Sequence, residues 1–284
     1  MNQRVTVAGM EVKTKVSSNL LINTENTEAT FATAITQEQQ EILEPVSTIN
    51  GVNFFYTLDA KADGSKNNPT TGEGAVEYTT YNISTAASNT SNYANKFSED
   101  YSLTKTAADA LIDGKEGAVG YVDYTFYIKA TNAEESAQAV KMTRCNLKYN
   151  NAVLSGDSEA GKAWRVGLFA QEVAKGAAGS GDGTLKTVLG LSGASYFTAT
   201  NQAVASTSTK SSVSLFGTAA NIDTALASGA TKYYKVVVRL WLEGEDTSCN
   251  NDTFAKLTSS WKLDLAFEMG TGTPDPVTVI GSAA

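Results

Sequence analysis

Residues 233–242, YYKVVVRLWL, decide the fold class of this chain, because they are nearly continuous in apolar and β-branched residues. Such a run is typical of a central strand that is covered on both faces. In residues 261–268, WKLDLAFE, Trp261, Leu263, Leu265 and Phe267 alternate with lysine, aspartate, alanine and glutamate. This period of two predicts a half-buried strand with one face in water.

Four further segments have strand patterns. Residues 119–130 place alternate apolar side chains on one face and are the expected partner of 233–242. The other three segments are residues 52–58, 140–149 and 164–173. Turns rich in Gly, Asn, Asp and Ser separate these strands. The sequence therefore predicts a mostly β fold, an antiparallel β-sandwich of Ig-like or jelly-roll type with long loop insertions and one or two short helices.

Helical patterns are sparse. Residues 36–44 begin with Thr36 and Gln39 at the spacing of a capping box, and Pro45 follows them. Residues 98–113 form a second candidate helix, which ends at Gly114. Neither segment alternates with strands as a parallel α/β fold requires.

The chain divides into three expected parts. Residues 1–18 form an N-terminal extended strand, which is a candidate donor strand for another copy. Residues 19–270 form the β-sandwich domain, with low-complexity insertions near 59–118 and 174–231 that are rich in Asn, Thr, Ser, Ala and Gly. Residues 271–284 form a strand-like tail.

Composition excludes several classes of function. The 284 residues include no histidine, which removes the usual general base and the commonest metal ligand. A net charge of −8 and a pI of about 4.7 argue against a surface that binds nucleic acid. Hydrophobic residues make up 42%, enough for a core, but no stretch approaches the roughly 18 apolar residues of a membrane span. We expect no enzymatic activity, no cofactor and no membrane insertion.

Both ends of the chain have short alternating patterns. Val5 and Val7 alternate with polar residues, and the phase then shifts across Gly9 to Met10 and Val12, which predicts a bulge. In the tail, Val277 and Val279 alternate with polar residues after two prolines. Each end is either an ordinary edge strand of its own domain or a strand that adds to a neighbouring copy.

Two cysteines and one acidic segment are the remaining candidates for chemistry. Cys145 and Cys249 belong to no CxxC pair, so they are either two buried thiols or one disulfide between distant segments. Residues 243–252 follow the central strand and contain Glu245, Asp246 and Asp252, which are candidate calcium ligands without EF-hand spacing. A solvated acidic turn is the favoured interpretation of this segment.

Three stretches carry a resemblance to a known family. They are RVTVAGMEVKTKVSSNLLI at residues 4–22, LEPVSTINGVNFFYT at 43–57 and YYKVVVRLWLEGEDTSCNN at 233–251. Together they resemble secreted surface proteins of Firmicutes, similar to the TasA and camelysin-like proteins, whose β-sandwich subunits form extracellular fibres. This chain is longer than a minimal sandwich of that kind, and its two insertions have no counterpart in the resemblance.

The resemblance implies a structural protein at the cell surface or in a biofilm matrix. Copies of the chain would bind one another by donor-strand complementation, in which Val5, Val7, Met10 and Val12 enter the sheet of the next subunit. The tail with Val277 and Val279 is a second candidate for such strand addition. A phage virion protein, such as a capsid-decorating or tail subunit, is the alternative function, followed by a sugar-binding adhesive module.

Overall fold

The computed structural model describes residues 5–17, 19–43, 47–48, 54–55, 118–119, 121–153, 159–190, 221–243, 246, 248–249 and 261–271. Within these residues the chain is mostly strand, and its two helical elements are single turns, η1 (Glu28–Thr30) and α3 (Glu159–Lys162). The same part of the chain contains no helix long and apolar enough to cross a membrane.

The first of two large sheets, here sheet A, contains both the first and the last described strand. Its strand order is β12 (Asn221–Leu226), β8 (Gln138–Tyr149), β14 (Trp261–Gly270), β1 (Val5–Val16), β3 (Ala34–Leu43) and β6 (Ala118–Val119), and β9 (Ala152–Val153) pairs with β8. Its pairs are antiparallel except for β1 with β14 and β3 with β6, which are parallel.

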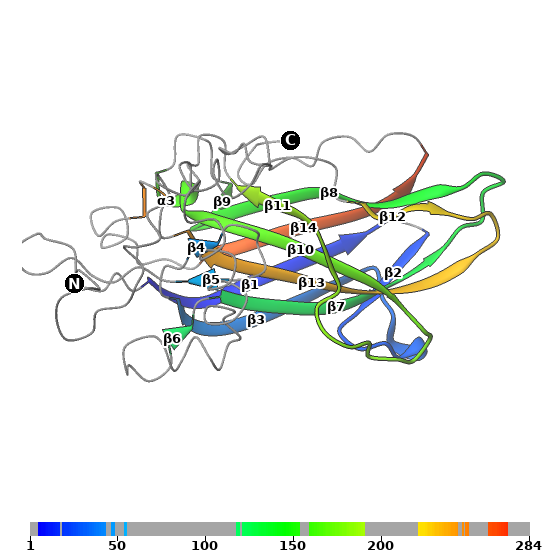
Figure 1. Ribbon diagram of the computed structural model, residues 1–284, viewed down its shortest axis with the longest axis horizontal. Coiled ribbons are helices and arrows are strands. Elements are labelled where there is room, and N and C mark those ends of the chain that lie inside the picture. Colours follow the sequence, from blue (N-terminus) through cyan, green and yellow to red (C-terminus); the bar gives the residue numbers. More distant parts are fainter. Residues whose placement is uncertain are drawn as a thin grey trace, which may run out of the picture.

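The second sheet, sheet B, is wholly antiparallel. Its order is β11 (Thr184–Gly190), β10 (Trp164–Val173), β13 (Thr231–Leu242), β7 (Tyr121–Thr131) and β2 (Leu20–Asn23). A separate two-stranded ribbon pairs β4 (Ser47–Thr48) with β5 (Phe54–Phe55). Figure 1 shows the long strands of both sheets running along the long axis of the molecule.

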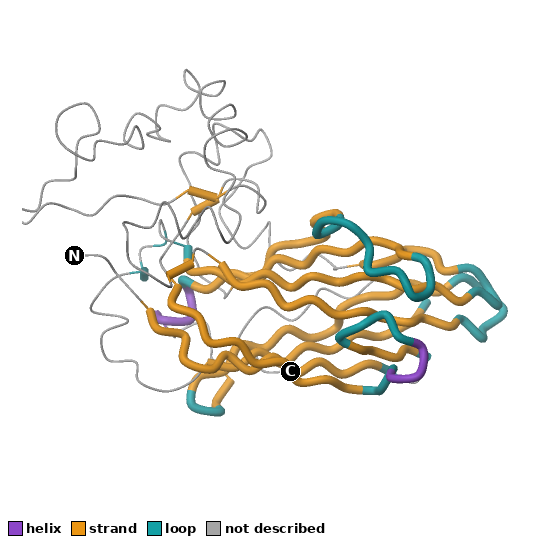
Figure 2. Tube along the Cα trace, turned by 90° about the horizontal axis from the view of Figure 1, so that it is seen from below, coloured by secondary structure: helices purple, strands orange, loops and turns teal. Residues whose placement is uncertain are grey.

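The two sheets form two layers, which Figure 2 shows from below, and the buried core residues come from both sheets. Aromatic rings join the layers. Trp164 of sheet B lies 5.0 Å from Trp261 of sheet A, centroid to centroid, and Phe126 of sheet B meets Phe267 of sheet A edge to face at 5.7 Å. The architecture is consistent with the predicted β-sandwich.

The two stretches that decide the fold class, 233–242 and 261–268, are strands as predicted. β13 lies between β10 and β7. Its side chains are buried on both faces, because Val236 and Val238 point into the core while Val237 is also only 1% exposed. Along β14, buried and half-buried residues alternate from Trp261 to Phe267. The prediction of a half-buried strand is therefore confirmed.

The predicted helix at residues 36–44 is wrong, because this segment is strand β3. Thr36 and Glu38 are exposed, whereas Gln37 and Gln39 are half-buried, so the segment has the period of a strand. The side-chain amides of Gln37 and Gln39 donate to the backbone carbonyls of Thr125 and Asp123 on β7, at 3.0 and 2.6 Å. β2 pairs with β7 only from Tyr127 to Ala130, so it does not reach the carbonyls of Thr125 and Asp123. The two glutamines therefore supply hydrogen-bond donors to this part of the edge of sheet B.

The glycine-rich loop between β10 and β11 lies on the outer face of sheet B. Its backbone carbonyls accept hydrogen bonds from Tyr127 (2.9 Å), Lys235 (2.7 Å) and Asn26 (2.8 Å). Gly183 has a φ of +89°, and a Cβ there would lie 2.7 Å from the carbonyl carbon of Ala170. Glycine is therefore required where the loop returns to the sheet.

Of the two predicted insertions, residues 174–231 contribute an edge strand to each sheet, β11 and β12. Most of residues 59–118 lies outside the described residues, and so does the predicted helix at 98–113. Of the predicted strand at 52–58, only β5 is described.

Candidate functional site

The strand predicted to be a donor, β1, lies between two strands of its own sheet. It pairs antiparallel with β3, from Val5 opposite Leu43 to Lys15 opposite Ala34. On its other side it pairs parallel with β14, over six residue pairs from Glu11 to Val16. We call the space between β3 and β14 the slot, and β1 fills it (Figure 1).

The inward face of β1 is part of the core. Met10 is 2% exposed and Val12 is fully buried, as the predicted pattern requires. Burial of a valine side chain contributes about 1.5–3 kcal/mol. The register shifts between Val7 and Met10, which confirms the bulge predicted at Gly9. The side chains of Val5 and Val7 lie outside the described part of the structure, although their backbone pairs with β3.

One polar side chain points into the core from the same face of β1. Thr14 is fully buried, and its hydroxyl has no hydrogen-bond partner among the described residues. A buried hydroxyl without a partner costs about 1–3 kcal/mol. Occupation of the slot by β1 is therefore weaker than its apolar residues alone would make it.

Charged side chains on the outer face of β1 meet those of β14. Glu11 lies 3.2 Å from Lys13 and 3.5 Å from Lys262, which is its direct cross-strand partner. Partial burial acts to raise the pKa of Glu11, but the two ammonium groups outweigh it and hold this pKa below its ordinary value. Because each charge faces its partner in one alignment only, these contacts favour a single register of β1 beside β14.

The connection from β1 to sheet B is short. After Val16 the chain enters β2 of the opposite sheet at Leu20. Ser17 is held against the end of β14, because its amide donates to the carbonyl of Phe267 at 3.1 Å and its hydroxyl accepts from the amide of Met269 at 3.3 Å. Residues 17–19 are thus the only covalent connection between β1 and the rest of the described chain.

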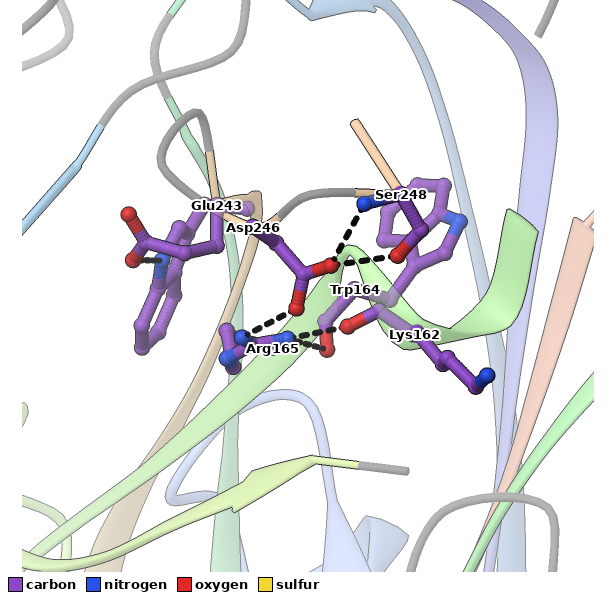
Figure 3. Close-up of polar contacts among 7 residues, drawn as sticks. Lys162, Trp164, Arg165, Glu243, Asp246 and Ser248 are labelled. Carbon is purple, nitrogen blue, oxygen red and sulfur yellow. Dashed lines mark hydrogen bonds and ion pairs between the residues drawn. The ribbon is translucent and has the colours of Figure 1, made fainter. Parts of the chain in front are cut away.

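Of the acidic segment 243–252, the structure describes Glu243, Asp246, Ser248 and Cys249, and these four residues are buried rather than solvated. Asp246 is 3% exposed and its carboxylate lies 2.9 Å from the guanidinium of Arg165, which is fully buried (Figure 3). Ser248 donates to the same carboxylate through its amide at 2.9 Å and through its hydroxyl. Glu243 is also fully buried and accepts from the indole of Trp241 at 3.3 Å.

The ion pair with Arg165 holds Asp246 against the start of β10. Arg165 also donates to the carbonyls of Lys162 and Trp164. A buried ion pair is strongly destabilising when only one partner is removed. We therefore regard the cluster as structural, a role that the order of residues along the chain could not reveal because Arg165 and Asp246 are 81 positions apart.

The remaining candidate residues are the two cysteines, the candidate metal ligands and the valines of the C-terminal tail. Cys145 and Cys249 are buried thiols that form no disulfide, which matches the first of the two interpretations of the sequence. Burial raises the pKa of both thiols well above their usual range. No group of three or more His, Cys, Asp or Glu residues in the described part of the chain could hold a metal ion. Glu245, Asp252, Val277 and Val279 lie outside that part.

Several features of the slot have no signal in the sequence. The apolar pattern predicts Met10 and Val12, but not the buried Thr14, the Glu11–Lys262 contact or the contacts of Ser17. The sequence QRVTVAGMEVKTKV carries one usable signal, since Glu11, Lys13 and Lys15 share the face opposite to Met10 and Val12. Their partners on β14 follow some 250 residues later, so the pattern alone could not name them.

Comparison of the chain with protein families, with curated proteins and with solved structures gives no match in any of the three.

Proposed function

We propose that this chain is a structural subunit that assembles with copies of itself into an extracellular or cell-surface filament. The contacts are non-covalent and head-to-tail, and β1 of one copy occupies the slot between β3 and β14 of the next. The observation that supports this proposal is the position of β1, a complete strand held in the slot and joined to the rest of the described chain only through residues 17–19.

Exchange between copies costs few contacts. β1 makes the same backbone pairs and buries the same side chains whether its slot belongs to its own copy or to another. The equilibrium between a copy that keeps its own β1 and copies that exchange it then depends on subunit concentration and on strain in the short link. Short links favour exchange. Each copy gives its strand to the next copy and receives one from the copy before it, so the contact is head-to-tail. Such a contact gives an open filament when the rotation between copies does not close a ring.

The wider features of the chain agree with this role. The resemblance to TasA and camelysin-like fibre proteins implies a β-sandwich subunit, and from the strand pattern we propose the Ig-like or jelly-roll type for this chain. A net charge of −8 keeps neighbouring filaments apart in solution. We assign the protein no catalytic activity and no cofactor.

A pair of engineered cysteines tests the donation directly. Lys13 on β1 and Thr36 on β3 are exposed cross-strand partners, so their Cα atoms lie about 4.5–5.5 Å apart, within the span of a disulfide. In Lys13→Cys/Thr36→Cys, donation predicts a ladder of covalent multimers on a non-reducing gel after assembly and oxidation. The native thiols do not interfere, because Cys145 and Cys249 are buried.

The control places the cysteines on strands that are not exchanged. Lys141 on β8 and Glu268 on β14 are also cross-strand partners, so Lys141→Cys/Glu268→Cys should give only cross-linked monomer. If Lys13→Cys/Thr36→Cys also gives only monomer from material that electron microscopy shows to be fibrous, the filament exists and β1 is not its donor. If the native protein stays monodisperse at high concentration, the filament itself is wrong.

A further inference from the structure

The first and last described strands, β1 and β14, lie side by side and run in the same direction (Figure 1). β1 begins at Val5 and β14 ends at Gly270, so these two points lie beyond opposite ends of the paired region. A tension applied through these two points acts along the strands. It loads the backbone hydrogen bonds of the pair together, in shear, rather than one after another.

We propose that the β1–β14 pair is a mechanical clamp, which makes the domain resist tension applied through its N-terminal and C-terminal strands. The clamp is the six parallel residue pairs from Glu11–Lys262 to Val16–Phe267, together with the two backbone contacts of Ser17. This role goes beyond self-assembly and is present in a single copy.

Each clamp strand is also fixed to the body of sheet A. β14 pairs with β8 over ten residues, from Trp261 opposite Tyr149 to Gly270 opposite Ala139. β1 pairs with β3 over nine residues. A pull along either strand therefore meets a hydrogen-bonded neighbour on both sides, so neither strand can leave by peeling from an open edge.

The side chains of the clamp oppose sliding on both faces. Inside, Val12 and its partner Leu263 are fully buried in the core. Outside, the Glu11 carboxylate lies between the ammonium groups of Lys13 and Lys262. A slip of one residue would turn the inward set of side chains to the solvent face. The clamp should therefore give way in one step rather than slide.

Pulling single molecules from two different pairs of points tests the proposal. The full chain, at a concentration where it is monomeric, is stretched between handle domains at its two ends. In a second arrangement, one handle is attached through Lys15→Cys near the end of β1 and the other remains at the C-terminal end. Because Lys15 pairs with Ala266, both forces then act at the same end of the pair and load its hydrogen bonds one after another.

We expect one high-force event end to end, which releases about 90 nm of chain between Val5 and Gly270. We expect a several-fold lower force in the second arrangement. Equal forces in the two arrangements would overturn the clamp. The outcome is separate from filament formation, since the measurement is made on single copies.

A matched pair of substitutions separates the clamp from general stability. Val12 on β1 and Val236 on β13 are both fully buried in the same core. Val12→Ala and Val236→Ala should lower equilibrium stability to a similar extent, and denaturant titration checks this. Forced unfolding depends on the unfolding barrier in the pulling direction, so only Val12→Ala should lower the end-to-end force. An equal loss of force in both variants would contradict the proposal.

Discussion

The hydroxyl of Tyr124 donates a buried hydrogen bond of 2.9 Å to the backbone carbonyl of Met10. Tyr124 lies on β7 in sheet B and Met10 on β1 in sheet A, so this bond joins the two layers across the core. It lies beside the register shift between Val7 and Met10. The bulge that interrupts the pairing of β1 with β3 and the bond that holds β1 to the opposite sheet thus occur at the same place.

The first prediction concerns this bond. Tyr124→Phe leaves the Met10 carbonyl buried without its donor, which should lower the free energy of unfolding by about 1–3 kcal/mol. Denaturant titration followed by tryptophan fluorescence measures it, since all three tryptophans are at most 2% exposed. Tyr127→Phe is the control, because its bond to Ala178 is only partly buried. Equal losses in the two variants would show that the cross-layer bond has no special weight.

A second prediction uses the buried hydroxyl of Thr14. Thr14→Val has nearly the same shape and removes a polar group that has no partner among the described residues. It should therefore raise the free energy of unfolding by about 1 kcal/mol or more. Thr36→Val, at an exposed position of β3, should change stability much less. A loss of stability in Thr14→Val would mean that the hydroxyl is satisfied.

Removal of one partner of the buried ion pair should be costly. Asp246→Asn removes the carboxylate charge that lies 2.9 Å from the buried Arg165 guanidinium and should cost about 3–5 kcal/mol. Asp264→Asn breaks the partly exposed pair with Lys148 and should cost at most about 1 kcal/mol. The double variant Arg165→Met/Asp246→Leu should lose less stability than Asp246→Asn. A double variant as unstable as the single one would argue against an uncompensated charge as the cause.

Asp223 should make stability depend on acidic pH. Burial acts to raise the pKa of its carboxyl, but donors from Tyr234 (2.6 Å), Ala225 (2.9 Å) and Lys232 (3.3 Å) outweigh it and hold the pKa below the ordinary 3.8. A lowered folded-state pKa gives stability that is present above the unfolded pKa and lost as pH falls through the folded one. The deficit of Asp223→Asn relative to wild type should thus shrink between about pH 5 and pH 2. A deficit that stays constant over this range would assign it to packing.

The local periodicity of the sequence was enough to identify the main strands of the domain. β13 and β14 follow from the alternation and continuity of their apolar residues, since a strand exposes its two faces to different surroundings. The bulge near Gly9 follows from a shift in the same alternation. These features depend on residues close together in the chain, and a pattern read along the chain contains that information.

Segment 36–44 shows where local signals fail. Glutamine and glutamate favour a helix, and Thr36 with Gln39 imitates a helix start. The segment is nevertheless a strand, because β1 offers it a ladder of backbone partners and β7 offers two carbonyls to Gln37 and Gln39. Those partners are distant in sequence, so tertiary contacts override the local preference.

The sequence by itself therefore determined a β-rich chain without histidine, with an amphipathic first strand and a buried central one. Only the tertiary structure decided that β1 lies parallel to β14 and that Asp246 is buried against Arg165. The physical reason is the same in both cases. Hydrophobic periodicity records which face of a strand is buried, whereas the choice of neighbouring strand and the pairing of buried charges depend on groups that only folding brings together.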